Sequence, residues 1–284
     1  MTGRLIHTGQ VVVDQVLRVD HLPARGGDVI ATSFQQTAGG GFNVMAAARR
    51  AGAEVVYAGS HGVGVHGDLI RAALAAEGVR VAHAATEPDS GISVVLVEPD
   101  GERTFVTSPD AVGRFVPVDV SVGDFVYVSG YGLVHDVDVL LDWLSGVRCS
   151  VLLDPGPLVG DISARTWDAI LPYVEIVSCN SAEASALPSA DVPVLVVRDG
   201  PDGCRFFRGG RVARVPGFPV VAVDSNGAGD AHCGVLAAEL LRGCDLVTAL
   251  TRANAAAAVS VTRLGPATAP GRLEVDELLL RFGV

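Results

Sequence analysis

An aspartate follows a glycine-rich turn near the C-terminal end of the chain, and this combination can bind an anion beside a base. Residues 220–239 read VVAVDSNGAGDAHCGVLAAE, so an apolar run leads into Gly227-Ala228-Gly229 and then into a helical pattern that Asp230 opens. A helix start has unpaired N–H groups and partial positive charge, which attract phosphate. A carboxylate there can take the proton of a neighbouring hydroxyl. The structural alternative is that Asp230 only complements the helix dipole and the glycines only form a turn.

A second glycine cluster, AGGGFN, also leads into a helical pattern. The backbone of Gly39 and Gly40 would let a polyhydroxylated ligand lie against the chain, and the Asn43 amide offers hydroxyl groups a donor and an acceptor. Asp14 stops an apolar run at 4–13 that predicts a buried strand, and ligands of parallel sheets gather at strand ends. A helix-entry turn and a turn-capping aspartate are the structural alternatives.

These two clusters resemble the signatures of the ribokinase-like (pfkB) carbohydrate kinases. DSNGAGDAHCG is similar to their D-T-x-G-A-G-D-x-F-x-G, with His232 where phenylalanine is usual. The first cluster is similar to their G-G-x-x-x-N, with Ala38 where the first glycine is usual. The resemblance implies an ATP-dependent kinase. In it Asp230 accepts the proton of a primary sugar hydroxyl, and N–H groups of the turn stabilise the transferred phosphoryl group.

The resemblance also implies the sugar side of the site. Its expected contacts are Asp14, Gly39, Gly40, Asn43, Arg103 and Tyr131. Ribokinases often carry a substrate-binding glutamate after the strand equivalent to 124–129, but this chain reads Ser129-Gly130-Tyr131-Gly132, which argues against ribose. The substrate could be a pentose or a hexose. It could also be a nucleoside whose base stacks on Tyr131, Phe34 or Phe42, which makes a nucleoside kinase of the same fold an alternative.

Shorter matches to motifs of the same family imply which residues contact the nucleotide. Its expected contacts are Asn180, Arg198, Gly200, Gly203 and Asn254. Arg198 replaces the usual threonine or lysine of a T-x-G-x-x-G stretch, and Asn254 lies in an alanine-rich helix that could merely pack closely.

Two cation sites are implied as well. Glu183 would act on the Mg²⁺ that accompanies ATP, although Asn180 and Glu183 also match a helix capping box. Asp224, with the backbone carbonyls of Asn226 and Val261, would hold a monovalent cation such as K⁺.

The order of apolar and helical segments predicts an α/β fold. We expect a ribokinase-like three-layer fold, with a mostly parallel central sheet flanked by helices, in a single domain of residues 1–284. Short strands at about 15–38 and 91–109 predict a small β-sheet lid inserted twice, from which Arg103 either reaches the substrate or is solvated. Family members often dimerise through this lid, so a homodimer is implied. The expected strands are 4–13, 54–59, 79–83, 124–129, 149–153, 175–179 and 193–197, with a hairpin at 203–215, and the later helices are 136–145, 163–171, 181–187, 229–242, 245–262 and 273–282.

Composition excludes several classes of protein. The net charge is −11, from 21 basic and 32 acidic residues, which argues against nucleic acid or an anionic membrane as a partner. Every basic residue is arginine, and the absence of lysine excludes P-loop NTPases, protein kinases and pyridoxal-phosphate chemistry. Five scattered cysteines without a C-x-x-C pair predict free thiols. With no leader or long apolar run, we expect a cytoplasmic enzyme that acts on a small molecule.

One motif supports a different enzyme. The segment GVGVHG at 62–67 matches the G-x-G-x-x-G fingerprint of dinucleotide-binding proteins, which would favour an NAD-dependent dehydrogenase. It follows a later strand instead of opening the fold, and Glu87, the acid that follows at the right distance, lies in a polar loop. A sugar-binding relative without catalytic activity is a third possibility.

Overall fold

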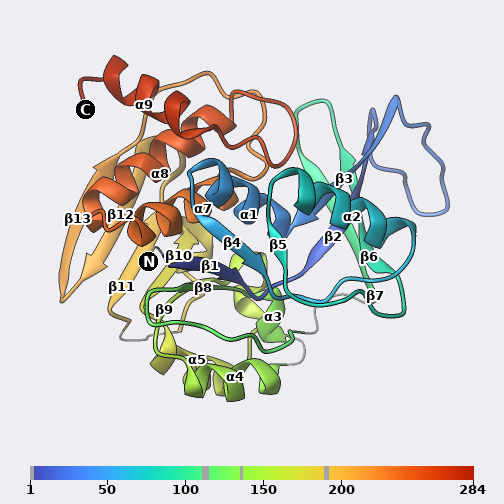
Figure 1. Ribbon diagram of the computed structural model, residues 1–284. Helices are drawn as coiled ribbons and strands as arrows, with labels where there is room; N and C mark the ends of the chain where they lie inside the picture. The colour runs from blue at the N-terminus through green and yellow to red at the C-terminus, as the bar shows by residue number, and fades with distance from the viewer. Residues whose placement is uncertain (1–2, 111–114, 135–136, 189–191) are drawn as a thin grey trace.

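The computed structural model describes residues 3–110, 115–134, 137–188 and 192–284, which form a large sheet between two layers of helices and a smaller sheet at one side (Figure 1). This arrangement confirms the predicted three-layer α/β fold. The large sheet has the strand order β13-β12-β11-β10-β9-β8-β1-β4-β5. Its strands are β1 (Arg4–His7), β4 (Glu54–Tyr57), β5 (Arg80–Val81), β8 (Phe125–Ser129), β9 (Ser150–Asp154), β10 (Ile176–Asn180), β11 (Val194–Arg198), β12 (Gly203–Arg208) and β13 (Arg211–Pro216).

The large sheet is mostly parallel, and its chain order reverses between β1 and β8. From β1 the chain continues to β4 and β5 on one side, whereas β8 continues to β9, β10 and β11 on the other. The hairpin β12–β13 adds antiparallel strands at one edge. Sheets of this kind bind ligands beyond the carboxyl ends of their strands, at the point of reversal.

Both faces of the large sheet are covered because successive side chains of its central strands point to opposite sides. In β1, Leu5 joins a core with α1, α2, α7, α8 and α9, while Ile6 joins a core with α4 and α5 on the other face (Figure 1). The helices are α1 (Gly41–Arg50), α2 (Val65–Ala76), α3 (Tyr131–Val134), α4 (Val137–Gly146), α5 (Ala164–Ile170), α6 (Ser181–Ala184), α7 (Ala228–Leu241), α8 (Leu246–Ser260) and α9 (Arg272–Arg281).

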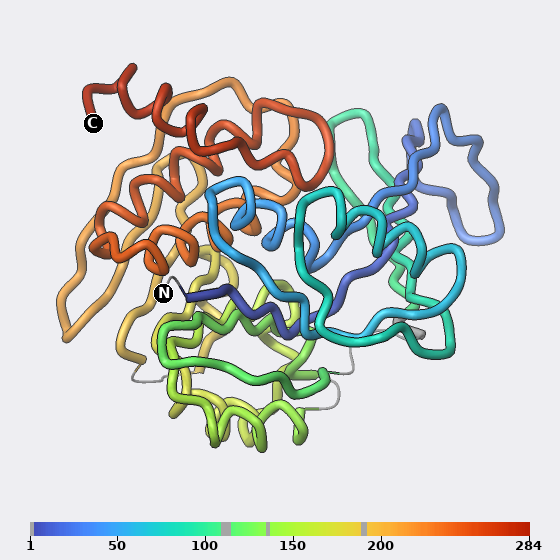
Figure 2. Tube along the Cα trace, in the orientation of Figure 1, coloured from blue at the N-terminus to red at the C-terminus, as the bar shows by residue number. Residues whose placement is uncertain are grey.

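The smaller sheet, which we call the lid, has the order β3-β2-β6-β7. Its strands are β2 (Val11–Arg18), β3 (Ser33–Gly40), β6 (Ser90–Val97) and β7 (Arg103–Asp110). Strands β2 and β6 are distant in sequence but pair in parallel, and Figure 2 shows them side by side. The pairing places Asp14, Ser93 and Thr107 in register across three strands.

The expected strand 4–13 is wrong, because this apolar run divides between the two sheets. The chain leaves the large sheet after His7 and enters the lid at Val11, so Asp14 lies inside a lid strand instead of ending a core strand. Alternating apolar residues cannot indicate which sheet each half of a run will join. The apolar run before the glycine turn, which could have been a strand or an extended arm, forms no strand, and its Val221 is 85% exposed.

Smaller differences concern the lengths of elements. Strand β5 has two residues where 79–83 was expected, and α6 has four where 181–187 was expected. Residue 136, the expected start of one helix, lies outside the described residues. All five cysteines are free, as predicted. Within the described part of the chain, every helix is too short or too polar to cross a membrane.

Candidate active site

A cleft of about 590 Å³ opens where the parallel strands of the large sheet end. The last residues of five strands line it, namely His7, Ser129, Asp154, Asn180 and Arg198. Lid strands form the opposite wall and contribute Asp14, Ser93, Arg103, Phe105 and Thr107. The first turn of α7 forms part of the floor. The cleft therefore combines groups from both sheets and from helix N-termini.

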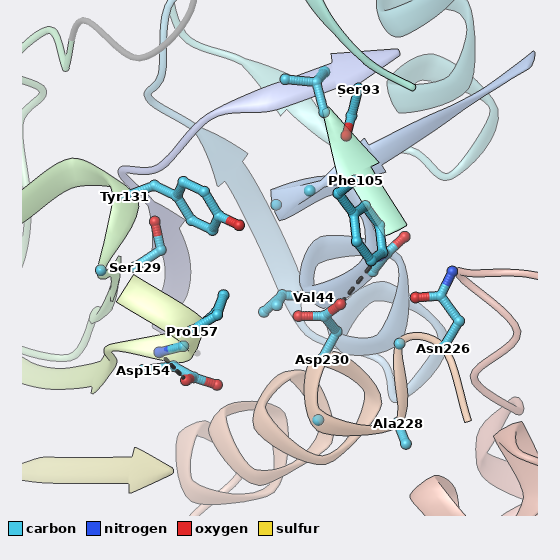
Figure 3. A pocket seen from close by; sticks show the side chains of 18 of the residues that line it. Val44, Ser93, Phe105, Ser129, Tyr131, Asp154, Pro157, Asn226, Ala228 and Asp230 are labelled. Carbon is cyan, nitrogen blue, oxygen red and sulfur yellow. Dashed lines mark hydrogen bonds between the residues drawn. The ribbon is translucent and has the colours of Figure 1, made fainter. Parts of the chain in front are cut away.

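Asp230 lies in the first turn of α7 and faces this cleft (Figure 3). The helix begins after Gly227, whose φ of 74° is the left-handed conformation that glycine adopts without strain. The Asn43 amide nitrogen donates to the Asp230 carboxylate at 3.0 Å, joining α1 to α7. Burial raises the pKa of Asp230 to about 6, against the effect of this hydrogen bond. Residues Gly227, Ala228 and Gly229 line the cleft beside it.

Asp14 approaches the same cleft from the lid. Its carboxylate lies against Gly39, where an added side-chain carbon would come within 2.1 Å of a carboxylate oxygen. Gly39 therefore makes room for Asp14 and does not itself line the cleft, whereas Gly40 and Asn43 do. Burial, together with the negative charge of Asp230, raises the pKa of Asp14 to about 7. A carboxylate from the lid sheet and one from helix α7 thus share one site.

Aromatic rings reach the cleft from opposite walls. Figure 3 shows Tyr131, at the start of α3, and Phe105, on β7, with their rings turned towards the space above Asp230. Two other aromatic residues considered from the sequence lie elsewhere. Phe42 is buried in the core, and Phe34 is an exposed lid residue outside the cleft lining.

A second pocket of about 530 Å³ adjoins the cleft. Its walls are mainly apolar and include Gly200, Gly203, Phe218, Ala257 and Val261. Asn254 lines it too, and its amide nitrogen donates to the carbonyls of Val215 and Pro216 at 3.0 and 3.1 Å. The two cavities share Asn180, Arg198, Ser225, Ala228 and Gly229, so they meet at the glycine turn.

Arg198 lies beneath this border with little exposure. Its Nη1 donates to Asp154 at 2.8 Å and to Ser178 at 2.9 Å, and its Nη2 lies 3.5 Å from Glu183. A side-chain carbon added at Gly229 would lie 3.5 Å from the guanidinium carbon, so the cation packs against the turn. Although burial acts to lower it, the neighbouring carboxylates hold the pKa of Arg198 well above its usual value.

Asn180 and Glu183 form the capping box considered from the sequence. The Asn180 side chain accepts from the Glu183 N–H, and the Glu183 carboxylate accepts from the Asn180 N–H, both at 2.8 Å. Both residues also line the cleft. Burial raises the pKa of Glu183. The structural and functional interpretations of this motif are therefore compatible.

The three residues expected around a monovalent cation lie close together, but the acceptor atoms of Asp224 and Val261 have partners. The Asp224 carboxylate pairs with Arg103 of the lid and accepts from the N–H groups of Asn226 and Gly265. The Val261 carbonyl accepts from the N–H groups of Val223 and Asp224. Asn226 itself lines the cleft.

Several cleft residues were not foreseen from the sequence. His7, Asp154, Ser93, Phe105 and Thr107 belong to this group. His7 and Asp154 end parallel strands, and this signal could have identified them. Burial lowers the pKa of His7 to about 3, and its Nδ1 accepts from the Gly9 N–H, so Nε2 carries the proton. His232, in contrast, is buried at the wall of the second pocket.

Comparison of this chain with known proteins agrees with this geometry. A family profile described as pfkB family carbohydrate kinase matches residues 3–271. The chain belongs to the pfkB family of carbohydrate kinases. This pfkB chain is 32% identical over 297 residues to the uncharacterized sugar kinase YegV of Escherichia coli (strain K12), covering 96% of this chain and 92% of that protein. It is 31% identical over 292 residues to the ribokinase of Bacillus subtilis (strain 168), covering 95% and 97% of the two chains.

A solved structure shows the same fold. The ribokinase of Arabidopsis thaliana, determined with ribose and ATP, superposes with a TM-score of 0.81 at 23% identity, covering 98% of this chain and 99% of that one. The pfkB protein is thus a sugar kinase of the ribokinase type, and the dehydrogenase alternative is wrong. At the start of α2, the N–H groups of His66 and Gly67 donate to Asp89 of the chain itself, so these donors of the glycine motif are already paired.

Proposed function

We propose that this pfkB kinase transfers the γ-phosphoryl group of ATP to a primary hydroxyl of a small sugar, either a pentose or a hexose. The observation that carries the proposal is the place of Asp230, which faces a polar cleft beside the turn where that cleft meets the apolar pocket. The sugar would occupy the cleft and the adenine the apolar pocket. The ATP phosphates would then cross the border between them.

The cleft offers a sugar hydroxyl groups of both polarities. Asp14 supplies two acceptor oxygens from the lid, and Asn43 Oδ1 is buried without a partner among the described residues. His7 Nε2 is a buried donor that also lacks one there. A buried polar atom left without a partner costs about 1–3 kcal/mol, so hydroxyl groups of a bound sugar would stabilise the site by pairing with these atoms.

Asp230 would act as the base in an in-line transfer. As the sugar oxygen attacks the γ-phosphorus, its O–H bond breaks and the proton passes to the Asp230 carboxylate. A new O–P bond forms while the bond from the γ-phosphorus to the bridging oxygen breaks, and ADP leaves. N–H groups at the start of α7, in the turn Gly227-Ala228-Gly229, would stabilise the charge on the transferred group.

Arg198 supports transfer in a protein without lysine. Its guanidinium packs against Gly229 at the border of both cavities, where the phosphates would lie. Asp154 and Ser178 fix its orientation. A buried cation that is already oriented stabilises developing negative charge without reorganising during the reaction. Arg198 would thus bind the nucleotide phosphates.

Glu183 and Asn180 fit a role beside Mg²⁺. One Glu183 oxygen serves the capping box, and the carboxylate still lines the cleft, as suits a carboxylate that contacts a hydrated Mg²⁺ through water. When bound with ATP, the ion would neutralise charge on the phosphates. Asn180 lines both cavities and would reach the nucleotide phosphates.

The lid would close over the sugar, exclude water from the phosphoryl group and so limit wasteful ATP hydrolysis. We also propose a homodimer through the lid. Phe34 and Val106 expose apolar side chains there, at 56% and 64% of their surface. Burying such side chains against a second copy is favourable.

A nucleoside is the second candidate substrate, and Phe105 and Tyr131 favour it. Phe105 is 53% exposed and Tyr131 37% exposed, and both face the cleft (Figure 3). A planar base could stack on either ring.

Release of ADP across a panel of pentoses, hexoses, sugar phosphates and nucleosides tests the proposal. We expect a pentose or a hexose to give the highest kcat/KM. A nucleoside that exceeds every sugar would replace the first candidate with the second. If no acceptor stimulates ADP release above ATP alone, the proposed function is wrong.

A further inference from the structure

Arg103 connects the lid to the loop that precedes the catalytic turn. It begins strand β7, and its guanidinium forms an ion pair with the Asp224 carboxylate, far away in sequence. The two side chains are only 16% and 8% exposed. An ion pair with so little contact with water is weakly screened by salt, so its loss has a larger effect than that of a surface pair.

Asp224 is also the point where two loops of the core meet. One carboxylate oxygen accepts from the Asn226 N–H at 2.8 Å, inside the turn that leads to Asp230. The other accepts from the Gly265 N–H at 2.9 Å, in the loop between α8 and α9. All of these partners are donors, and Arg103 also carries a positive charge, so each of them stabilises the ionised form of the carboxyl group. Asp224 is therefore a carboxylate anion whose charge needs a cation.

The oxygens around Asp224 do not suit K⁺ in this arrangement. A cation that binds through oxygen needs several unpaired lone pairs converging on one point, and hard cations take six or more oxygen ligands. Here both carboxylate oxygens accept N–H bonds, and the Val261 carbonyl accepts two, from Val223 at 2.7 Å and Asp224 at 3.0 Å. The positive charge at this carboxylate comes from Arg103 instead.

We propose that Arg103 takes the place of a monovalent cation in this kinase, and that by pairing with Asp224 it holds the turn 224–227 in its anion-binding geometry. Turnover then needs no K⁺. Because Arg103 belongs to the lid, the charge reaches Asp224 when the lid closes, so closure over the sugar and preparation of the phosphate site are one event. Arg103 is a positioning residue in this scheme, and the scheme rests on the proposed kinase activity.

The positive charge of Arg103 would also favour phosphoryl transfer, because it neutralises Asp224 beside the turn that receives the phosphates. Without its charge, Asp224 would present an unpaired carboxylate close to the turn that receives the phosphates, and like charges repel strongly where little water screens them. Removal of Arg103 also frees the lone pair of the Asp224 oxygen that the guanidinium occupies beside the Asn226 N–H, so a small cation could then enter and restore neutrality. Substitution of Arg103 should therefore convert an enzyme indifferent to K⁺ into one that depends on it.

The experiment compares sugar phosphorylation in KCl and in tetramethylammonium chloride at equal ionic strength, since the organic cation is too large for such a site. We expect the wild type to differ by less than about twofold between the salts. Arg103→Ala should lose about tenfold or more in kcat in tetramethylammonium, as expected for breaking a poorly hydrated ion pair, and regain most of it in KCl. Arg25→Ala, which removes an exposed arginine from the loop between the lid strands β2 and β3, is the matched control and should behave as the wild type.

Thermal unfolding supplies a readout that does not need turnover. The melting temperature of Arg103→Ala should rise in KCl relative to tetramethylammonium chloride, whereas that of the wild type should not. Arg103→Gln serves as a second variant if the alanine protein does not fold. Strong activation of the wild type by K⁺, or equal impairment of both variants in both salts, would overturn the proposal. If no acceptor is phosphorylated, the kinase proposal fails, but K⁺-dependent melting of the variants still decides the role of Arg103.

Discussion

The polar cleft and the apolar pocket share the glycine turn as a wall but differ in how they are built. The cleft joins two sheets and contains two carboxylates, the buried Asp14 and the half-buried Asp230, whose pKa values are raised to about 7 and about 6. The pocket draws on α7, α8 and the loops beside them and is lined by small apolar residues such as Ala257 and Ala258. One cavity is suited to hydroxyl groups and proton transfer, the other to a flat ring.

This difference indicates where each kind of specificity arises. Hydroxyl groups are distinguished by polar atoms in fixed positions, because a mismatch leaves a buried donor or acceptor unpaired. A base can be accepted mainly through shape and apolar contact. Substitutions on the cleft side should therefore change catalysis and sugar recognition, and substitutions on the pocket side should change nucleotide affinity.

The largest effect is expected from Asp230→Asn, which keeps the shape of the side chain but removes the base. General-base catalysis contributes about 10²–10⁴-fold, so kcat should fall by that factor. The dissociation constant for ATP should change little because the pocket is intact. Single-turnover kinetics and calorimetric titration measure the two quantities. Near-normal turnover would show that Asp230 is not the base.

The pH dependence of kcat/KM should separate the two carboxylates. Asp230 must be ionised to accept a proton, and Asp14 is the better acceptor for hydroxyl groups when ionised. Burial sets their pKa values near 6 and 7, so kcat/KM should fall below pH 7 more steeply than for one ionisation. Asp14→Asn should leave a single ionisation near pH 6. A flat profile from pH 8 to pH 5 would contradict both assignments.

Filling the apolar pocket with a larger side chain tests whether this pocket binds the adenine of ATP. Leucine at position 257 would project extra methyl groups into the space proposed for adenine. We expect Ala257→Leu to raise the KM for ATP by about tenfold, the effect of about 1.4 kcal/mol of lost binding, with the KM for the sugar unchanged. Steady-state kinetics with each substrate varied in turn measures both. An increase confined to the KM for the sugar would mean that the sugar occupies the apolar pocket and the adenine occupies the cleft.

The last prediction concerns stability and leaves catalysis aside. The pKa of Asp14 is raised by burial, so the folded state holds its proton more tightly than the unfolded state does. Stability therefore falls as pH rises from about 4 to about 7, and the full cost remains above pH 7. Asp14→Asn should be more stable than the wild type at pH 8, by about 1–4 kcal/mol, with the difference lost near pH 4. Denaturation by urea at both pH values measures it.

Sequence patterns predicted much of this molecule because their signals are local. Asp230 and its turn follow from residue types at close spacing, and the alternation of strands and helices follows from apolar periodicity. The division of residues 4–13 between two sheets was not predicted. The run is interrupted at Gly9, but the apolar residues before and after Gly9 suit either sheet equally well. Arg198 was expected near the nucleotide, but its orientation could not be predicted, because its partner Asp154 is far away in the chain.

By itself the sequence determined that the chain is an α/β protein, that it handles phosphate without lysine, and that an aspartate begins a helix after a glycine turn. The tertiary structure alone decided that Asp14 of the lid faces Asp230, that Asp154 orients Arg198 beneath the turn, and that Arg103 pairs with Asp224. The physical reason is the distance along the chain over which each kind of interaction acts. Periodicity and helix-start chemistry act over a few residues, whereas these contacts exist only once the order of strands brings distant segments together.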